Sequence, residues 1–599
     1  MPRAVRRKHP AAVPAPTSPV GPRTGLRCLG AALVSAGLLW LCYFPANCGW
    51  LAWVALVPWL MLVRAELPTR RHYLITYALT YPLAIRLRIP LPKSRYSIAW
   101  LAGLALYVPA LAWMRTGYTE MVVFWLLLAL YCSWYFPLAL WLVRRLDART
   151  RLPLTLTVPL VWTALEYVRG WLAGGFAWYF LGHTQHDFLP AIQVADLAGV
   201  AAVTFLVAAV NGLLAEAAGQ IPAVRAWFNL SATDLRPAVR WQAVAVAAAL
   251  LLTLGYGGWR LTEGEFPAGP RVALLQPSIP QTERNAASVD EAGDPLARAS
   301  IDEQMATLSK RAVRAAQLPD LVIWPETTFP YERKEVAPGA PDSNDLTAFR
   351  KDLADRAQLA KEQAELAGTN VLLGLNTRTY GADGKIRRYN TALLLTRGGE
   401  VVGRYDKMHL VPFGEYIPLK DELPFVAKLS PYGSYDYTLT PGEAQTRFSL
   451  TVGDRTYHFG VVICYEDADA PLARGLVKPS AGPPADFLVN TSNDGWFMGT
   501  AEHAEHLAIS RFRAVECRRA VVRAVNGGIS AVIDGNGRVV ALPAESWAKS
   551  HSVTGVVTAA VPLDTRTSLY ARLGDWLPWT CWGVVLVGCW WRPKAHPIP

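Results

Sequence analysis

Cysteine is scarce in the part of this chain that has the composition of a soluble domain. Of eight cysteines, only Cys464 and Cys517 fall within residues 262–572, and the other six lie in or beside apolar runs. This distribution excludes a disulfide framework, and no cysteines have the spacing of a structural zinc site. Internal repeats and long low-complexity tracts are also lacking, which excludes a repeat architecture.

Charge is sparse as well, at 18% of residues, whereas 52% of residues are hydrophobic. A chain of 599 residues with this composition is too long for one domain and too apolar to be wholly soluble. Nearly all long charge-free runs precede residue 262 or follow residue 572. The net charge of +12 lies largely in short loops between apolar runs, so we expect no nucleic-acid partner.

A bilayer core takes about 20 apolar residues per helix, and the pattern predicts about eight spans. The runs are 26–44, 47–63, 96–114, 121–143, 153–169, 188–214, 241–260 and 573–591. The run at 73–86 is short, contains Pro82 and precedes Arg86 and Arg88, so we interpret it as interfacial or re-entrant. The first run lacks a small-x-small cleavage site behind it, which favours an uncleaved anchor over a signal peptide.

Loop charges predict the orientation of these spans. Arginine and lysine concentrate in both tails and in the loops after the second, fourth and sixth runs, all on one side of the membrane. The opposite loops, 45–46, 115–120 and 170–187, contain only Arg115 as a positive charge. The positive-inside rule places the basic side in the cytoplasm. We therefore predict a cytoplasmic tail (1–25), a membrane domain with seven spans (26–261), an extracytoplasmic domain (262–572), and a last span with a cytoplasmic tail (573–599).

Residues 262–572 alternate short β-rich runs with amphipathic stretches, which predicts an α/β sandwich. Several of the β-rich runs are continuously apolar, as expected for strands that are buried on both faces. The predicted strands are 271–276, 320–324, 371–375, 391–396, 459–463, 487–490 and 529–533, and the predicted helices are 299–317, 344–367 and 502–520.

Three residues close to these apolar runs form a candidate nucleophilic site. Cys464 ends one run, Glu326 lies in Ile323-Trp-Pro-Glu326, and Lys407 lies in Gly403-Arg-Tyr-Asp-Lys407. A thiol is mostly protonated at neutral pH, so it needs a cation to lower its pKa and a carboxylate to take its proton. Taken alone, a cysteine at the end of an apolar strand is more often a small buried hydrophobe than a nucleophile. Cys517 lies in a helical pattern and is expected to pack, although a Cys464–Cys517 disulfide would remove the nucleophile.

Four motifs carry a resemblance to the nitrilase, or carbon–nitrogen hydrolase, superfamily. They are Trp324-Pro-Glu326, Tyr405-x-Lys407 with Pro412-Phe-Gly-Glu415, Ile463-Cys-Tyr-Glu466, and Ser492-Asn-Asp-Gly-Trp-Phe497. Between membrane spans, these motifs resemble the bacterial apolipoprotein N-acyltransferase family. The resemblance implies a nitrilase-like α-β-β-α sandwich with Glu326 as general base, Lys407 as the stabilising cation and Cys464 as nucleophile. It also implies that Glu415 is a second acid of the site, and that Tyr465 and Glu466 line its pocket.

The same resemblance implies a two-step acyl transfer. Cys464 would take an acyl group from a glycerophospholipid as a thioester, and the α-amine of the diacylglyceryl-cysteine of an apolipoprotein would then accept it. This reaction needs a phospholipid donor, a diacylated apolipoprotein acceptor and the bilayer, but no cofactor and no metal. The implied location is the bacterial inner membrane, with the catalytic domain in the periplasm.

Two other functions fit parts of the sequence. The same three residues would serve a membrane-tethered nitrilase-type amidase that hydrolyses C–N bonds with water. A non-catalytic membrane assembly protein is the other alternative, and the intact Glu326, Lys407 and Cys464 argue against it.

Some positions depart from the family pattern or suggest other chemistry. Asn285 stands where the family usually has Trp, which bears on the packing of the acyl chain. His503 and His506 with Glu502 resemble a metal-binding pair on a helix. No third ligand follows at a suitable spacing, so we predict structural or pocket-lining roles for them.

The loop charges generate a test of topology. Reporter fusions after Gly293 and after Ala148 should report opposite compartments, because seven spans place residue 293 outside and residue 148 on the basic, cytoplasmic side. A cytoplasmic signal from both fusions would contradict the span count.

Overall fold

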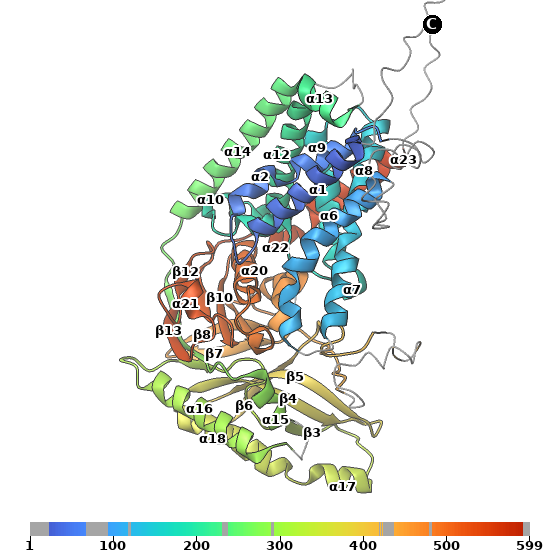
Figure 1. Ribbon diagram of the computed structural model, residues 1–599. Helices are drawn as coiled ribbons and strands as arrows, with labels where there is room; N and C mark the ends of the chain where they lie inside the picture. The colour runs from blue at the N-terminus through green and yellow to red at the C-terminus, as the bar shows by residue number, and fades with distance from the viewer. Residues whose placement is uncertain are drawn as a thin grey trace, which may run out of the picture.

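The computed structural model describes residues 23–67, 94–117, 121–230, 238–288, 293–418, 420, 422, 437–478 and 482–590. The expected interfacial piece at 73–86 lies outside these residues. Figure 1 shows a bundle of helices at one end of the molecule and two sheets with their own helices at the other.

The bundle is built mainly from segments that the sequence predicts as spans. Its principal helices are α1 (Arg23–Cys42), α6 (Arg95–Ala110), α7 (Met121–Ser133), α8 (Tyr135–Arg149), α9 (Leu154–Arg169), α12 (Val200–Gln220), α13 (Pro222–Phe228), α14 (Val239–Thr262) and α23 (Trp576–Trp590). Within the described residues, four helical segments are long and apolar enough to cross a membrane: Thr24–Cys42, Met121–Arg149, Val200–Gln220 and Val239–Thr262. A count of eight spans therefore stays a prediction.

The expected span at 47–63 is a series of short turns. They are η1 (Gly49–Leu51), α2 (Ala52–Ala55), α3 (Val57–Leu60) and η2 (Met61–Val63). Neighbouring helices supply hydrogen bonds that one continuous helix would have made: Asn211 accepts from the Leu56 N–H at 2.8 Å, and Ser35 accepts from the Trp59 N–H at 2.9 Å. Broken helices persist at membrane depth only where protein groups satisfy the backbone in this way.

The expected span at 188–214 is also interrupted. Two single turns, α10 (Leu189–Ile192) and α11 (Ala195–Ala198), precede α12, and Gly199 separates them from it with a φ of 71°. This backbone conformation favours glycine, and a Cβ at position 199 would meet the Tyr570 ring at 2.9 Å. The chain therefore turns here, and it places Asp196 at the junction with the sheets.

Two sheets form the middle of an α-β-β-α sandwich. The first has the order β13-β1-β2-β4-β5-β6, with β3 paired to β4, and the second has the order β12-β11-β10-β9-β8-β7. The strands are β1 (Ala268–Gln276), β2 (Leu321–Ile323), β3 (Arg333–Val336), β4 (Asn370–Tyr380), β5 (Ile386–Leu395), β6 (Val401–Asp406), β7 (Arg447–Val452), β8 (Arg455–Ile463), β9 (Phe487–Asn493), β10 (Ala520–Asn526), β11 (Ala531–Ile533), β12 (Val539–Ala541) and β13 (Gly555–Pro562). The α/β sandwich expected from the sequence is thus present, and apolar side chains from both sheets fill the space between them.

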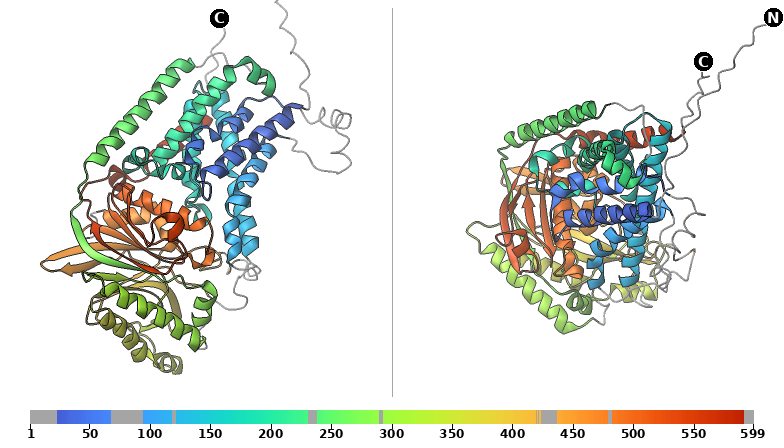
Figure 2. Two further views of the ribbon diagram at one scale, coloured as in Figure 1. Left: turned by 60° about the vertical axis from the view of Figure 1, so that its left-hand side comes forward. Right: turned by 45° about the horizontal axis from the view of Figure 1, so that its top comes forward.

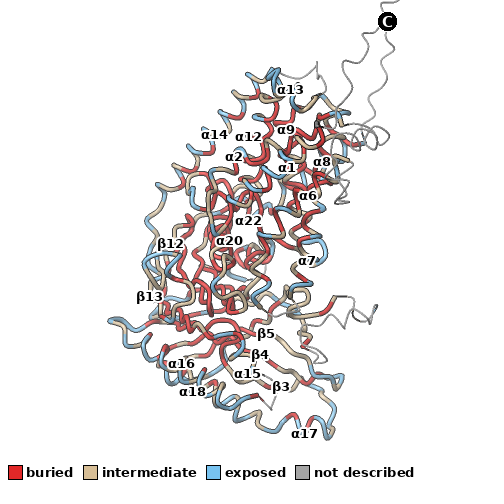
Figure 3. Tube along the Cα trace, in the orientation of Figure 1, coloured by how far each residue is buried: buried red, intermediate tan, exposed pale blue. Residues whose placement is uncertain are grey.

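Each sheet carries helices on its outer face. Residues of α16 (Pro295–Val313) and α18 (Leu353–Ala367) pack on the first sheet, and those of α19 (Ala470–Val477) and α20 (Glu502–Cys517) pack on the second. The other side of α20 meets the bundle, because Ile509, Phe512 and Val515 belong to the bundle core. The left view in Figure 2 shows the second sheet between the first sheet and the bundle, and Figure 3 shows α20 buried at this junction.

A buried ion cluster joins the bundle to the sandwich. Asp196 of α11 accepts hydrogen bonds from Arg518 at 2.6 Å and from Arg260 at 2.9 Å through Oδ2, and from the Tyr256 hydroxyl through Oδ1. Arg518 is fully buried at the end of α20. An isolated guanidinium would be costly there, so Asp196 fixes the position of α20 relative to the bundle.

Asp196→Ala should lower the stability of the protein by about 3 kcal/mol, because it leaves Arg518 buried without its carboxylate. Thermal unfolding in detergent measures this loss. The control Asp383→Ala removes an exposed pair with Arg387 and should leave the midpoint nearly unchanged. Equal midpoints for both variants would contradict a structural role for the Asp196 cluster.

Candidate active site

A cavity of about 670 Å³ lies where the sandwich meets the bundle. Glu326, Lys407, Glu415, Cys464 and Tyr465 line it, so the structure brings together five of the six site residues predicted from the sequence. Its wall continues into the bundle through apolar side chains, which include Trp113, Met121, Phe124, Leu127, Leu128 and Trp178. The cavity is therefore polar where Glu326, Lys407 and Cys464 line it and apolar where it extends into the bundle.

Cys464 lies at a sharp turn between β8 and the 3-10 helix η7 (Cys464–Ala468). Its φ of 53° is unusual for a residue with a side chain, and such strained positions are common at active sites. The Asn490 amide secures the turn by donating to the carbonyls of Val462 and Cys464, each at 3.2 Å. The strand and the turn together present the thiol to the cavity.

The pKa of the Cys464 thiol is raised to about 12, chiefly by burial and then by the Glu326 carboxylate, although Lys407 opposes the shift. Lys407 thus lowers this pKa as the sequence predicts, but burial and the Glu326 carboxylate outweigh it. The thiol is protonated at neutral pH, so a nucleophilic role would require a base.

Lys407 follows β6 and lies between two carboxylates. Its Nζ donates to Glu415 Oε1 at 2.8 Å and to Glu326 Oε1 at 3.4 Å. Burial alone would lower the pKa of Lys407, but Glu415 and Glu326 outweigh it and raise the pKa well above its usual value. Lys407 is therefore a fixed positive charge beside Cys464.

Asn390 on β5 is a member of the site that the sequence-based reasoning missed. Its amide donates to Glu326 Oε1 at 2.6 Å and to Glu415 Oε1 at 3.3 Å. Glu326 also accepts from the Asn493 backbone N–H through Oε2 at 2.8 Å. These bonds hold both carboxylates in place. No motif includes Asn390, and a single polar residue just before an apolar run is a weak signal of a functional site.

Tyr465 and Glu466 follow Cys464 but face different surroundings. Tyr465 lines the cavity, stacks on Trp178 with ring centroids 5.3 Å apart, and donates to the Gly175 carbonyl at 3.0 Å. The expectation that Glu466 lines the pocket is wrong: it is fully buried and is not part of the cavity wall. Its sequence neighbourhood could not show this, because consecutive residues in η7 point in different directions.

The Glu466 carboxylate instead ties two loops of the site together. It accepts from the backbone N–H groups of Ile463 at 2.6 Å, Met408 at 2.6 Å and His409 at 3.0 Å, and from the Tyr405 hydroxyl. Burial raises the pKa of Glu466 to about 7, against the effect of these donors. Glu466 therefore supports the turn of Cys464 and the loop of Lys407.

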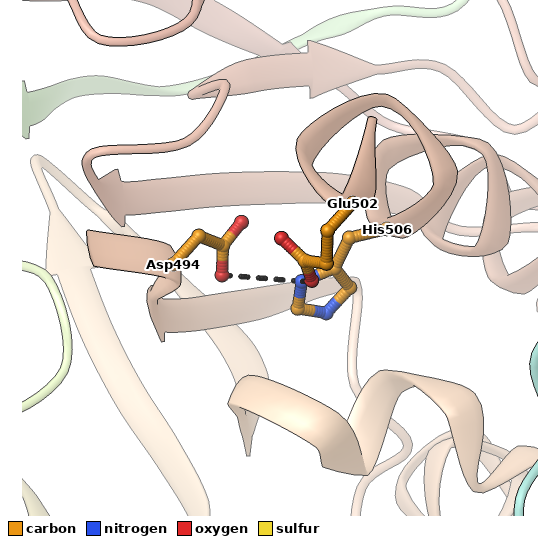
Figure 4. Close-up of side chains that lie close together, drawn as sticks. All are labelled: Asp494, Glu502 and His506. Atoms are coloured by element: carbon orange, nitrogen blue, oxygen red, sulfur yellow. Dashed lines mark hydrogen bonds and ion pairs between the residues drawn. The ribbon is translucent and has the colours of Figure 1, made fainter. Parts of the chain in front are cut away.

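A second polar group, formed by Asp494, Glu502 and His506, also lines the cavity. Figure 4 shows both carboxylates beside the His506 imidazole. His506 Nδ1 lies 3.2 Å from Asp494 Oδ1 and 3.4 Å from Glu502 Oε1, and its Nε2 lies 3.0 Å from Asp467 Oδ1. His506 therefore has the pocket-lining place that the sequence predicts, whereas His503 Nε2 faces the Asp494 carbonyl at 3.2 Å. The sequence pattern did not include Asp494.

Asn285, the departure from the family pattern, lies in the cavity wall. It is part of the short helix α15 (Gln281–Ser288), and its Oδ1 accepts from the Gln281 amide at 2.8 Å. A small polar side chain therefore stands at a position where an aromatic ring would project into the cavity.

Comparisons with known proteins match both halves of the chain. The apolipoprotein N-acyltransferase N-terminal domain matches residues 35–213, and the carbon-nitrogen hydrolase domain matches residues 271–571. An apolipoprotein N-acyltransferase from Geobacter metallireducens is 31% identical over 82% of this chain and 85% of its own. One from Rhodopirellula baltica is 27% identical over 93% and 95%. A solved mutant of the amidase from Nesterenkonia sp. AN1 has 16% identity and a TM-score of 0.34, over 52% of this chain and 99% of the amidase.

Glu466→Gln should destabilise the protein by about 1–3 kcal/mol, because the amide NH2 would face a backbone donor and at least one hydrogen bond would be lost. Thermal unfolding in detergent should show a lower midpoint. Glu443→Gln changes an exposed carboxylate and serves as the control. An unchanged midpoint for Glu466→Gln would contradict the proposed tie between the two loops.

Proposed function

Because the chain belongs to the apolipoprotein N-acyltransferase family, we propose that it transfers an acyl chain from a glycerophospholipid to the α-amine of an apolipoprotein's diacylglyceryl-cysteine. The observation that carries the proposal is the single cavity that joins Glu326, Lys407 and Cys464 to the apolar side chains of α7. A water-soluble substrate needs no such apolar channel, whereas two lipid substrates do.

Lipid enters the cavity beside α7 in this proposal. Phe124, Leu127 and Leu128 of α7 line the cavity, while Val123 and Leu130 of the same helix are exposed. An exposed apolar face at this level fits contact with acyl chains, and the inner side of the helix continues that apolar surface toward Cys464. An acyl chain can thus stay in an apolar environment along its path.

The first half-reaction uses the geometry around the thiol. As the Cys464 sulfur attacks the ester carbonyl carbon, Glu326 takes the thiol proton, and the Lys407 ammonium stabilises the oxyanion. The ester C–O bond then breaks, and the proton passes from Glu326 to the departing alkoxide of the lysophospholipid. Cys464 is left as a thioester, and every proton is accounted for.

The second half-reaction repeats these roles with an amine. The nitrogen attacks the thioester carbon, Lys407 again stabilises the oxyanion, and the C–S bond breaks to leave an amide. Glu326 takes a proton from the attacking nitrogen and passes it to the Cys464 sulfur. The sequence of two transfers through one covalent intermediate predicts ping-pong kinetics.

Glu415 and Asn390 act as positioning residues in this scheme. Glu415 offsets the charge of Lys407 in the resting site, and Asn390 orients the two carboxylates through one amide. Tyr465 and Glu466 hold the turn that presents the thiol. The scheme requires no metal or organic cofactor.

We further propose that the protein lies in the bacterial inner membrane with about eight spans and with its sandwich in the periplasm. The asymmetry of arginine and lysine between the loops supports this orientation. Hydrolysis of small amides by the same three residues is less well supported, because it would use neither the apolar cavity nor the bundle.

A trapped thioester tests the proposal. Wild-type protein mixed with phospholipid, and with no acceptor, should gain the mass of one acyl group in a form that hydroxylamine removes. Cys464→Ser and Glu326→Gln should not form this adduct. Lys407→Ala should slow its formation by about 10²–10³-fold, the usual cost of losing an oxyanion donor.

Cys517→Ser is the matched control, because this thiol is buried on α20 and does not line the cavity. It should form the adduct at the wild-type rate. Addition of a diacylated lipopeptide should discharge the adduct and give an amide-linked, triacylated product. Acyl transfer that survives Cys464→Ala would rule out the covalent mechanism.

A further inference from the structure

Glu502 has a carboxylate oxygen that nothing in the described structure satisfies. The residue opens α20, is only 3% exposed and lines the same cavity as Cys464. Its Oε1 lies 3.4 Å from His506 Nδ1, but Oε2 is buried without a hydrogen-bond partner among the described residues. Burial of an unpaired carboxylate oxygen is costly, so a donor brought by a ligand would be strongly favoured there.

The neighbouring charges are already balanced, which leaves Glu502 as the free acceptor of the group. Arg523 donates a hydrogen bond to Asp494 Oδ2 at 2.7 Å, and His506 Nδ1 lies 3.2 Å from Asp494 Oδ1. His506 Nε2 lies 3.0 Å from Asp467 Oδ1. The carboxylates of Asp467 and Asp494 raise the pKa of His506 well above its usual value, although burial and Arg523 oppose this. Two cations thus face three carboxylates, counting Glu502, and this excess of negative charge favours a further cation at Glu502 Oε2.

The group lines the same cavity as Cys464. Trp178 links the two, because its ring lies 5.3 Å from Tyr465 and 5.2 Å from His506. The charges of His506 and Asp494 also act on the Cys464 thiol. A cation bound by Glu502 would therefore lie within the reach of a substrate that is reacting at Cys464.

We propose that Glu502 binds the α-ammonium group of the acceptor and takes its proton before the amine attacks the thioester. This inference rests on the proposed function and adds a binding site for the second substrate. An N-terminal amine is mostly protonated at neutral pH, and an ammonium has no lone pair for attack. The second half-reaction therefore needs an additional base, which removes a proton from the ammonium before the nitrogen attacks.

The protons balance with two carboxylates. Glu502 takes one proton from the ammonium and passes it to solvent. The nitrogen forms a bond to the thioester carbon, the C–S bond breaks, and Glu326 carries the second amine proton to the Cys464 sulfur. Burial, followed by the Asp494 carboxylate, raises the pKa of Glu502, which makes it a better base near neutral pH.

Glu502→Gln tests the assignment, because the amide keeps the size of the side chain and loses its basicity. The two half-reactions are measured separately, with the thioester formed first from phospholipid and then discharged by a diacylated lipopeptide. The variant should slow discharge by the lipopeptide at least tenfold more than it slows thioester formation. Glu502→Asp, which keeps a carboxylate, should recover part of the rate.

Discharge by hydroxylamine separates proton removal from a merely structural effect. Hydroxylamine is mostly uncharged at neutral pH, so Glu502→Gln should leave its discharge rate within about twofold of the wild type. Glu505→Gln is the matched control, since Glu505 is buried one residue from His506 on the same helix. It accepts from the Phe44 N–H at 2.7 Å and does not line the cavity.

Several outcomes would overturn the inference. Equal slowing of lipopeptide and hydroxylamine discharge would assign Glu502 a structural role, and wild-type rates for both would remove it from the reaction. The ligand atoms of Asp494, Glu502 and His506 lie within 4.8 Å of one another. A bound metal whose chelation slows discharge would therefore replace the amine as the ligand. A wild-type protein that never forms the thioester would instead refute the proposed function itself.

Discussion

The buried ammonium of Lys407 between Glu326 and Glu415 is the constraint on which the site depends. These three side chains come from loops that follow β2 and β6 and from the segment after Lys407, so no single element can form the group. A lysine that is 1% exposed would lose its charge or destabilise the fold if either loop moved away. The ion group therefore requires the first sheet to hold its loops in one arrangement.

The same group determines the resting state of the thiol. The pKa of about 12 for Cys464 follows chiefly from burial and then from the Glu326 carboxylate, against the effect of Lys407. A neutral thiol is a poor nucleophile toward adventitious electrophiles. In the proposed mechanism, the site gains reactivity when an ester carbonyl reaches Lys407, because the ammonium then stabilises the oxyanion that forms.

The sequence was sufficient to predict the sandwich and the core of the site, but not their supporting contacts. Apolar runs predicted β1, β4 and β8, because buried strands have a continuous signal. The predicted helix 344–367 is two helices, α17 (Asn344–Arg350) and α18, because Asp352 adopts a φ of 63°. Such a left-handed residue other than glycine has little local signal.

Long-range contacts account for the other structural features that the sequence did not predict. Asn390 belongs to the site only because β5 pairs with β6 and thereby reaches Lys407. The interruption at Gly199 depends on Tyr570, more than 300 positions later in the chain. A window of neighbouring residues contains neither partner, so no periodicity could have predicted these features.

The junction at α20 explains how one cavity can serve two parts of the molecule. Arg518 at the end of the helix binds Asp196 of the bundle, while Glu502 and His506 at its beginning line the cavity. The helix α20 therefore connects the Asp196 cluster to the cavity wall. The cavity has an apolar wall from α7 and a polar wall from α20. In the proposed mechanism, these two walls let an acyl chain and a charged amine approach the same sulfur atom from different sides.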